Sequence, residues 1–436
     1  MSLLQRLRER FWFIPAVLCL GAFALAEALI ALDEHLGDLE LPPWAAAVLY
    51  RVGESGSRDL LGAIAGSSLA VAGTTFSITM AVLALTSSTY GPRLVRNFMA
   101  DRGNQAVLGV FVATFLYALL VLRSIRVIGD GDEDAFVPHL AVNVAVVLAV
   151  VDVAVLIYFI HHISDSIQIA TLTAGVRQDL RATVERLYPR RGTPDPDGAD
   201  GDPWTPPDDG APVLARRSGY VQFTDEDDLV ELGARRDVVV SLSVRPGRYV
   251  LEGAVVARVH PGGRADDDTL DSVRTCIHLA DARTPYQDPE FAVQQLTETA
   301  VRALSPGIND PYTAVNALDD LSSGLSLLAA RAPQPRGRTD GDGTLRVRSP
   351  RVEAGELVTA VLDAMRWYAS GAPSVMYATV ALVERVAAAT SSASLRGTLH
   401  AQLGLLQDAF AAAGHHDHDV RLFADRVAAA RSGLLG

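Results

Sequence analysis

The chain has 436 residues, 49% of them hydrophobic, and a formal net charge of −13 at pH 7. Its mean hydropathy is nevertheless positive, so the apolar and acidic residues must be concentrated in different parts of the chain. The acidic balance argues against a nucleic-acid-binding protein, which needs a basic face. The sequence contains no lysine, which excludes a P-loop lysine, a Schiff-base lysine and a lysine general base.

Four apolar stretches are long enough to cross a membrane as helices, which takes roughly 20 residues each. They lie at about residues 11–32, 60–85, 105–122 and 137–160. A signal peptide is the alternative for the first stretch, but its apolar region is too long and no small-residue cleavage site follows it. We therefore predict a mainly α-helical integral membrane protein with a four-helix transmembrane domain over residues 1–160.

The charges between these spans predict the orientation of the chain. Arginines precede the first span and separate the second from the third, whereas the other two loops are acidic. The arginines on these two sides are Arg6, Arg8, Arg10, Arg93, Arg96 and Arg102. Basic loops stay in the cytoplasm, so we expect a multi-pass membrane protein with both termini in the cytoplasm.

The second span has two different faces when it is drawn as a helix. Small residues lie on one face, namely Gly62, Gly66, Ala70 and Gly73, and indicate close approach of another helix. Hydroxyl residues lie on the other face, namely Ser68, Thr75, Thr79 and Thr86. These hydroxyls bond either to carbonyls of their own helix or to a neighbouring helix. Alternatively, they line a water-filled pathway.

Asp152 lies near the middle of the fourth span. A carboxylate inside a bilayer is costly unless it is protonated, paired or hydrated, and is a functional-site hypothesis by default. The alternative is a neutral carboxyl group that is hydrogen-bonded to a neighbouring helix. Both interpretations stay open at this level.

The rest of the chain divides by composition. Residues 161–188 keep a helical apolar spacing and predict a stalk helix, whereas the Pro-, Gly- and Asp-rich residues 189–215 predict a disordered linker. The β-branched runs in residues 216–262 predict a small β subdomain. Residues 266–436 predict a helical cytoplasmic domain, interrupted by a flexible insert at 332–350.

The segment "SPGINDP" at residues 305–311 separates two predicted helices. An aspartate followed by proline begins each of these helices, as an N-cap with proline at the first helical position. A stop signal fused to this start signal accounts for Pro306, Gly307, Asp310 and Pro311. A ligand-binding role would rest on the polar residues that remain, Asp288, Arg302 and Asn309.

Residue types for catalysis and metal binding are sparse. Cys19 and Cys276 lie in separate stretches and predict neither a disulfide framework nor a zinc site. The segment "GHHDHD" at residues 414–419 is more typical of a solvated turn than of a metal site, because no other ligand cluster accompanies it. We therefore predict no catalytic residue, no metal and no cofactor, and an enzyme is the weakest hypothesis.

Several of these segments resemble one family of bacterial predicted membrane proteins, called domain of unknown function 2254. They are "AGTTFSITMAVLALTSSTYGPRLVRNFMAD" (72–101), "LGVFVATFLYALLVLRS" (108–124), "YFIHHI" (158–163) and "ARTPYQDPEFAVQQLTETAVRALSPGINDPYTA" (282–314). The resemblance covers nearly the whole chain and implies this architecture, but no established activity. Asp152 and the long linkers are not part of the family's pattern.

The leading functional hypothesis is an oligomeric channel or transport-like protein with a regulatory cytoplasmic domain. Four spans leave little room for a pathway in one copy, so the pathway would form between copies. The alternative is a membrane-anchored sensor or scaffold whose cytoplasmic domain binds a ligand or a partner protein. The expected partners are the lipid bilayer, further copies of this chain and an unidentified ion, small ligand or protein, with no nucleic acid.

Overall fold

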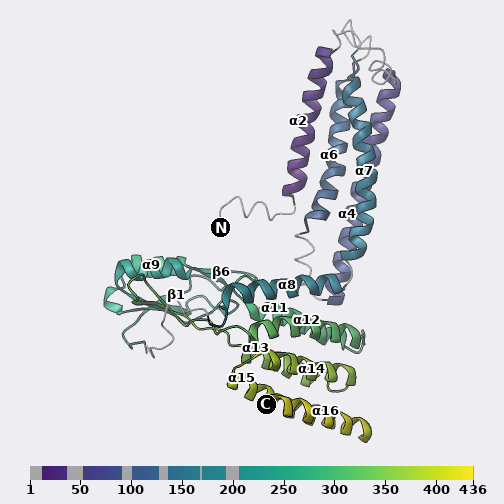
Figure 1. Ribbon diagram of the computed structural model, residues 1–436. Helices are drawn as coiled ribbons and strands as arrows, with labels where there is room; N and C mark the ends of the chain where they lie inside the picture. Colours follow the sequence, from purple (N-terminus) through teal and green to yellow (C-terminus); the bar gives the residue numbers. More distant parts are fainter. Residues whose placement is uncertain are drawn as a thin grey trace. The chain divides into compact units, whose positions relative to one another are not determined.

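A computed structural model describes residues 12–36, 53–90, 101–126, 136–166, 169–192 and 206–435. Within these ranges the side chains at 85–90, 165–166, 169–172 and 435 are not described. The chain forms two compact units, Met1–Thr171 and Leu172–Gly436, and its elements are labelled in Figure 1. Below, the first is called the membrane unit and the second the C-terminal unit.

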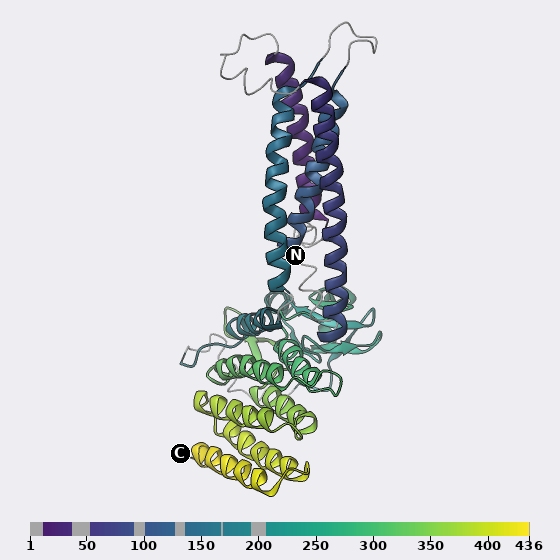
Figure 2. The same cartoon turned by 90° about the vertical axis from the view of Figure 1, so that its right-hand side faces the viewer.

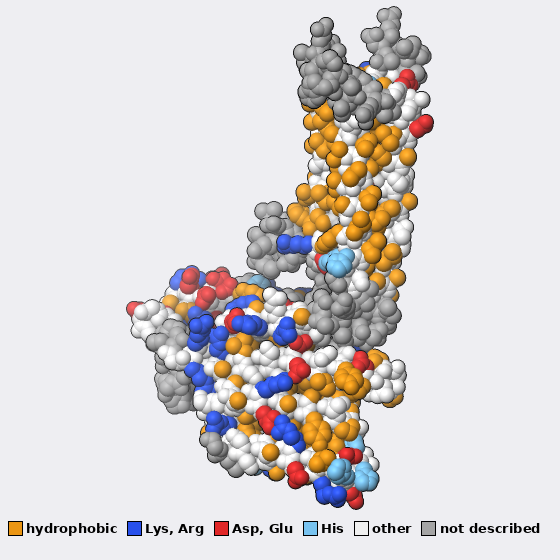
Figure 3. Space-filling view, turned by 45° about the vertical axis from the view of Figure 1, so that its right-hand side comes forward, with side chains coloured by type: hydrophobic (Ala, Val, Ile, Leu, Met, Phe, Trp, Pro, Cys, Tyr) orange, Lys and Arg blue, Asp and Glu red, His pale blue; other side chains and the backbone are white. Residues whose placement is uncertain are grey.

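The membrane unit is a bundle of four helices, and each is long and apolar enough to cross a membrane. These helices are α2 (Phe13–Leu36), α4 (Glu54–Tyr90), α6 (Arg102–Ser124) and α7 (His139–Ser166). The prediction of four spans is confirmed, although α4 begins six residues earlier than we predicted. Apolar side chains cover the visible outer surface of the bundle, whereas charged ones gather on the C-terminal unit (Figure 3). This distribution explains how the chain is both apolar and acidic.

Helix α6 is the central helix of the bundle and packs against α2, α4 and α7. It lies close to α2 at Gly109, where an added Cβ would lie 2.7 Å from Leu18 Cδ1 and 3.0 Å from Pro15 Cα. By contrast, an added Cβ at Gly62, Gly66 or Gly73 of α4 would meet no atom within 4 Å. The small-residue face of α4 therefore contacts no other helix in the described bundle.

The β part of the C-terminal unit consists of two sheets and two helices. Its strands are β1 (Ala211–Leu214), β2 (Gly219–Thr224), β3 (Val239–Leu242), β4 (Tyr249–Val250), β5 (Val255–His260), β6 (Ile277–Ala280), β7 (Gly337–Thr339) and β8 (Leu345–Arg348). The strand orders are β1-β5-β3-β8-β7 and β4-β2-β6. Helices α9 (Glu226–Arg236) and α10 (Asp267–Thr275) complete this part. Val240 and Val259 lie in its core and are fully buried.

Two predicted boundaries are wrong. The insert at 332–350 is not simply a flexible loop, because it contains β7 and β8, and β8 pairs in parallel with β3 inside the five-stranded sheet. The predicted linker likewise ends too late, because β1 begins at Ala211. The charged residues around β8 obscured this strand in the sequence. Val347 is buried, and its neighbour Arg346 is largely buried as well, in ion pairs with Asp237 and Asp340. The predicted β subdomain therefore takes strands from outside 216–262.

The remaining helices form three stacked hairpins (Figure 2). They are α11 (Pro289–Ala303), α12 (Pro311–Ala329), α13 (Ala354–Tyr368), α14 (Pro373–Ala389), α15 (Ala393–Ala412) and α16 (Asp417–Leu435). Helices α11, α13 and α15 form one row, and α12, α14 and α16 form the other. Each hairpin buries its apolar face against the next, as in helical repeat proteins.

Helix α8 (Ile169–Leu187) occupies the position of the predicted stalk. Its Val176, Leu180 and Val184 are fully buried, and Leu180 packs against Gly324 of α12, where an added Cβ would overlap it. The prediction of a projecting stalk is therefore wrong from Leu172 onward. The apolar face that the spacing predicts is present. It packs against α12 of the same chain, about 140 residues later in the sequence.

Candidate functional site

The hydroxyl face of α4 points into the membrane unit. Ser68 Oγ donates a hydrogen bond to Asp152 Oδ2 at 2.7 Å, and Thr114 Oγ1 of α6 donates to Asp152 Oδ1 at 3.0 Å. All three side chains are buried. Asp152 is therefore held by two neighbouring helices, which is one of the two arrangements expected from the sequence.

The two threonines that follow make bonds within their own helix. Thr75 Oγ1 donates to the Ala72 carbonyl at 2.9 Å, and Thr79 Oγ1 donates to the Thr75 carbonyl at 2.8 Å. The void that they line together with Asn104 measures only ≈ 10 Å³, barely the size of one water molecule. The side chain of Thr86, the fourth predicted hydroxyl, lies outside the described residues. The described hydroxyl face thus borders a packed interior.

The "SPGINDP" corner is a tight connection between α11 and α12. Asp310 is the N-cap of α12, accepting from the backbone N–H of Thr313 at 3.1 Å and from its hydroxyl at 2.6 Å, and Pro311 is the first helical residue. Asn309 adopts a left-handed conformation with φ 48°, which Asn tolerates better than most residues. Pro306 and Gly307 are exposed in the turn itself. The capping predicted from the sequence is therefore present.

The three polar residues on which a ligand-binding role would rest, Asp288, Arg302 and Asn309, do not lie together. Asp288 caps the start of α11, whereas Asn309 follows its end, and a 15-residue helix is roughly 22 Å long. Arg302 is paired with Glu298 one turn earlier, at 2.9 Å. The corner therefore does not bring these residues together into one ligand site.

Asp288 instead has a structural environment. Its carboxylate accepts two hydrogen bonds from Arg283, at 2.7 and 2.9 Å, and one from the backbone N–H of Phe291. Burial raises the pKa of Asp288, and the Arg283 guanidinium opposes that rise. An added Cβ at Gly247, which has φ +89°, would overlap this carboxyl group. Asp288 thus anchors the turn that carries Arg245.

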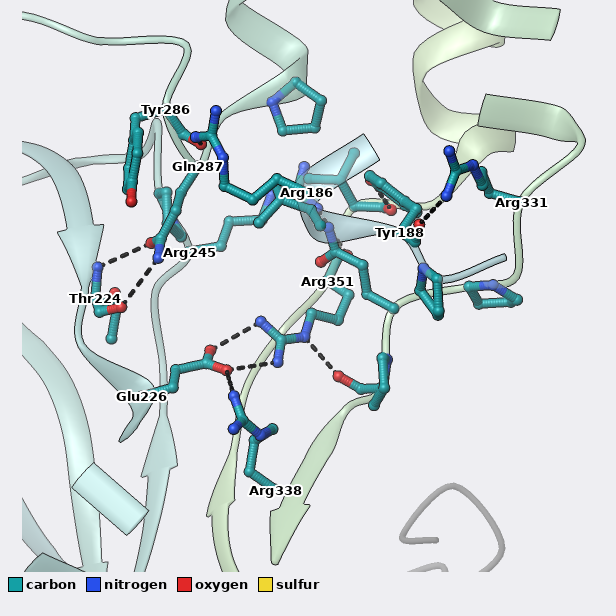
Figure 4. Close-up of a pocket in the computed structure, with 18 of the residues that line it drawn as sticks. Arg186, Tyr188, Thr224, Glu226, Arg245, Tyr286, Gln287, Arg331, Arg338 and Arg351 are labelled. Carbon is teal, nitrogen blue, oxygen red and sulfur yellow. Dashed lines mark hydrogen bonds and ion pairs between the residues drawn. The ribbon is translucent and has the colours of Figure 1, made fainter. Parts of the chain in front are cut away.

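Arg245 lines a cavity of ≈ 840 Å³ in the C-terminal unit, formed where the β part meets the helical stack. We call this cavity the arginine cleft (Figure 4). Its charged lining residues are six arginines and four acids: Arg186, Arg190, Arg245, Arg331, Arg338, Arg351, Glu185, Asp225, Glu226 and Asp227. A second cavity of ≈ 780 Å³ adjoins it and shares Tyr188, Arg331 and Arg351. Both volumes lie in the range that is typical of small-molecule binding sites.

One wall of the arginine cleft is electrically balanced. Arg351 forms a two-pronged ion pair with Glu226, with both N–O distances 2.8 Å, and Arg338 pairs with Asp227 at 2.8 Å. Arg245 lies between Glu290 and Glu356, at 3.3 and 3.0 Å. These bidentate and bridging contacts hold the guanidinium groups in place, so this wall is rigid rather than available for a charged ligand.

The other wall carries arginines without a carboxylate partner among the described residues. Arg186 donates to the Tyr286 carbonyl at 2.6 Å and lies 4.2 Å from the centre of the Tyr286 ring. Arg331 donates to the Tyr188 carbonyl at 3.2 Å. Arg190 is exposed and is joined to Arg331 by an antiparallel backbone bridge. This wall therefore has a local excess of positive charge.

Tyr188 forms the floor between the two walls. It is buried, and its hydroxyl donates to the Val352 carbonyl at 2.9 Å. Burial raises the pKa of Tyr188, so it remains a neutral donor at physiological pH. The exposed ring of Tyr286 and the ring of Phe223 lie beside each other, with centroids 5.8 Å apart. The cleft can therefore offer both positive charge and aromatic surface.

Sequence reasoning missed this cleft because its residues come from six separated segments. Arg190 and Tyr188 lie at the edge of the predicted linker, and Arg338 and Arg351 lie in or beside the predicted insert. The only available signal was the density of arginines in "LYPRR" and "RVRSPR". Among the residues that the structure describes, no group of three His, Cys, Asp or Glu side chains could hold a metal ion.

Comparison with known proteins bears on the identity of the chain. Residues 8–385 match the family model described as "Predicted membrane protein (DUF2254)". The uncharacterized proteins Mb1321c of Mycobacterium bovis and Rv1290c of Mycobacterium tuberculosis are each 35% identical over 355 residues, covering 80% of this chain and 67% of theirs. No solved structure matches the chain. The four apolar helices and the match over most of its length agree: this chain belongs to the DUF2254 family of predicted membrane proteins.

Proposed function

We propose that this protein is a membrane-anchored sensor whose C-terminal unit binds a small ligand in the arginine cleft. The observation that carries this proposal is the cleft itself. It is a cavity of ≈ 840 Å³ with one charge-balanced wall and one wall of arginines that have no carboxylate partner among the described residues. Ligand sites commonly form at such junctions between packed layers. Among the two hypotheses from the sequence, this favours the sensor.

The membrane unit supports the same preference. Thr75 and Thr79 donate to carbonyls of their own helix, and Ser68 donates to Asp152. A water-filled pathway needs polar groups that face water, whereas these hydroxyls are buried and hydrogen-bonded inside one copy. In this proposal the four helices anchor the protein and the C-terminal unit performs recognition.

Thermal unfolding of the full chain in detergent tests the sensor. The probes are nucleosides, nucleotides, sugar phosphates, dicarboxylates and amino acids. We expect at least one probe to raise the melting temperature, because a ligand that binds only the folded state stabilises it. Ala332→Trp, which fills the cleft, should remove that rise, whereas Ala411→Trp on the exposed surface of α15 should keep it. A rise that survives Ala332→Trp, or no rise at all, contradicts the proposal.

A channel or transport-like role is the second candidate, and Asp152 is the observation that favours it. It is 6% exposed and lies near the middle of its span, where ionisable residues often mark ion pathways. Ion flux into proteoliposomes that is lost in Asp152→Leu would support this role. If the unaltered protein gave no ion flux under any gating condition tested, the channel role would be rejected.

We further infer that the protein lies in the bacterial plasma membrane with both termini in the cytoplasm, on the charge pattern of its loops. Reporter fusions at residues 38 and 436 test this orientation, because only the first should be active outside the cytoplasm. Association with further copies of the chain is part of the same proposal. Light scattering of the detergent-solubilised protein measures it, and a single chain per particle would exclude it.

A further inference from the structure

The proposed function does not name the chemical class of the ligand. The residues of the arginine cleft narrow the classes of ligand that can bind there. We infer that the cleft binds a small phosphate ester, with its phosphoryl group between Arg186, Arg190 and Arg331. This inference rests on the proposed function, since it requires that the cleft be a ligand site. It goes beyond that function by naming the chemical class of the ligand and the residues that hold its charge.

The arginines that lack a described carboxylate partner lie on one wall of the cleft. Arg338, Arg351 and Arg245 each have carboxylate partners within 3.3 Å. The other three arginines of the cleft are Arg186, Arg190 and Arg331, and none of them has a carboxylate partner among the described residues. Arg186 and Arg331 donate to backbone carbonyls. Positive charge that no described carboxylate neutralises therefore gathers on one wall, and an anion placed there would gain charge-assisted hydrogen bonds.

A backbone bridge places Arg190 and Arg331 next to each other. The Ala332 N–H donates to the Pro189 carbonyl at 3.0 Å, and Arg190 and Arg331 are directly opposite each other in this antiparallel contact. Directly opposed side chains have Cβ atoms about 5 Å apart, and like charges in that position are destabilising. An anion between the two guanidinium groups would remove this repulsion.

The geometry of the arginine side chains favours one shape of anion. A guanidinium presents its N–H donors as a planar fork that suits phosphate and carboxylate oxygens. Three such forks match the three outer oxygens of a phosphoryl group, whereas a single carboxylate offers two oxygens. Arg186 is also fixed over the Tyr286 ring, so its orientation is set before the ligand arrives. We therefore favour phosphate over carboxylate.

The space beside this wall is large enough for an organic group. A cavity of ≈ 840 Å³ is far larger than a free phosphate ion, and its aromatic residues Phe223 and Tyr286 offer a surface for an organic group. Tyr286 is 52% exposed, so part of its ring is free to contact a ligand. A phosphate carried on a sugar or a nucleoside uses both the charged wall and this aromatic surface.

Isothermal titration calorimetry of the full chain in detergent tests the inference. ADP and glucose 6-phosphate are compared with adenosine and glucose, which lack the phosphoryl group, and with succinate. We expect at least one phosphate ester to bind about tenfold or more tightly than its unphosphorylated counterpart. Arg190→Gln and Arg331→Gln should each weaken that binding by about tenfold, because each removes a charged donor.

Arg235→Gln is the matched control. Arg235 is an exposed arginine on α9 that pairs with Glu231 at 3.6 Å, away from the cleft, and its replacement should leave binding unchanged. Each variant is first shown to melt at the temperature of the unaltered chain. Equal weakening by Arg235→Gln, equal binding of adenosine or succinate, or failure of both phosphate esters to bind would overturn the phosphate assignment. The sensor proposal is judged separately by the broader probe set and Ala332→Trp.

Discussion

Asp152 of α7 accepts a 2.7 Å hydrogen bond from Ser68 of α4, which lies 84 residues earlier in the chain. Thr114 of α6 donates to the other oxygen of the same carboxyl group. One side chain thus joins three of the four helices of the membrane unit. Interhelical hydrogen bonds of this kind contribute modestly to the stability of membrane proteins.

We expect Ser68→Ala and Asp152→Ala each to destabilise the membrane unit, and the double variant to cost less than the sum of the two. The coupling energy should be about 1 kcal/mol, the usual size of such bonds in membrane proteins. Unfolding in mixed detergent micelles measures it. Ser67→Ala is the control, because Ser67 donates only to the Ile64 carbonyl of its own helix. Strict additivity of the two substitutions would contradict the pairing.

Gly324 on α12 provides the space that Leu180 of α8 occupies. An added methyl group there would overlap the Leu180 side chain, so Gly324→Ala should destabilise the C-terminal unit by about 1–3 kcal/mol through overpacking. Thermal unfolding of the full chain followed by circular dichroism measures the loss. Gly397→Ala on α15 is the control, because Gly397 is exposed and nothing lies within 4 Å of its added Cβ. That variant should be neutral or stabilising by up to about 1 kcal/mol.

Asp310 should make the α12 N-terminus sensitive to acid. The Thr313 hydroxyl and then the Thr313 backbone N–H hold the pKa of Asp310 below its ordinary value of 3.8. A depressed pKa stabilises the folded chain above the unfolded pKa, and this contribution is lost as the pH falls through the folded pKa. Asp310→Ala should cost about 1 kcal/mol at neutral pH.

Asp310→Asn separates the cap from its charge, since Asn is also a good N-cap. It should cost little at neutral pH and should flatten the dependence of the melting temperature on pH below about 4. Both variants are compared by thermal unfolding across an acid pH series. An unchanged acid slope in Asp310→Asn would show that this carboxylate does not contribute to it.

Cys276 should react slowly with thiol reagents. Burial raises the pKa of its thiol from 9.0 to about 11, and only the thiolate is the nucleophile. Below pH 9 the thiolate fraction should therefore be about a hundredfold lower than for an ordinary cysteine. Alkylation of a Cys19→Ser chain, native and denatured, measures this. Equal rates in the two states would contradict the burial of Cys276.

The sequence alone was sufficient to predict those elements whose physical cause lies within a few neighbouring residues. The four apolar stretches gave α2, α4, α6 and α7, because a span needs only length and apolarity. The caps at Asp288 and Asp310 were equally readable, since an N-cap bonds to residues two or three positions away. The family resemblance rested on these same contiguous segments.

Tertiary structure decided which residues meet. Nothing local in "GTLRVR" indicates that Val347 is buried beside β3, because the flanking Arg346 is paired with Asp237, a carboxylate 109 residues earlier in the chain. The same holds for the arginine cleft, in which Arg190 and Arg331 come together through a backbone bridge. Helix periodicity and capping act over a few residues, whereas the partner of a charge or of a strand is chosen by the packing of the whole unit.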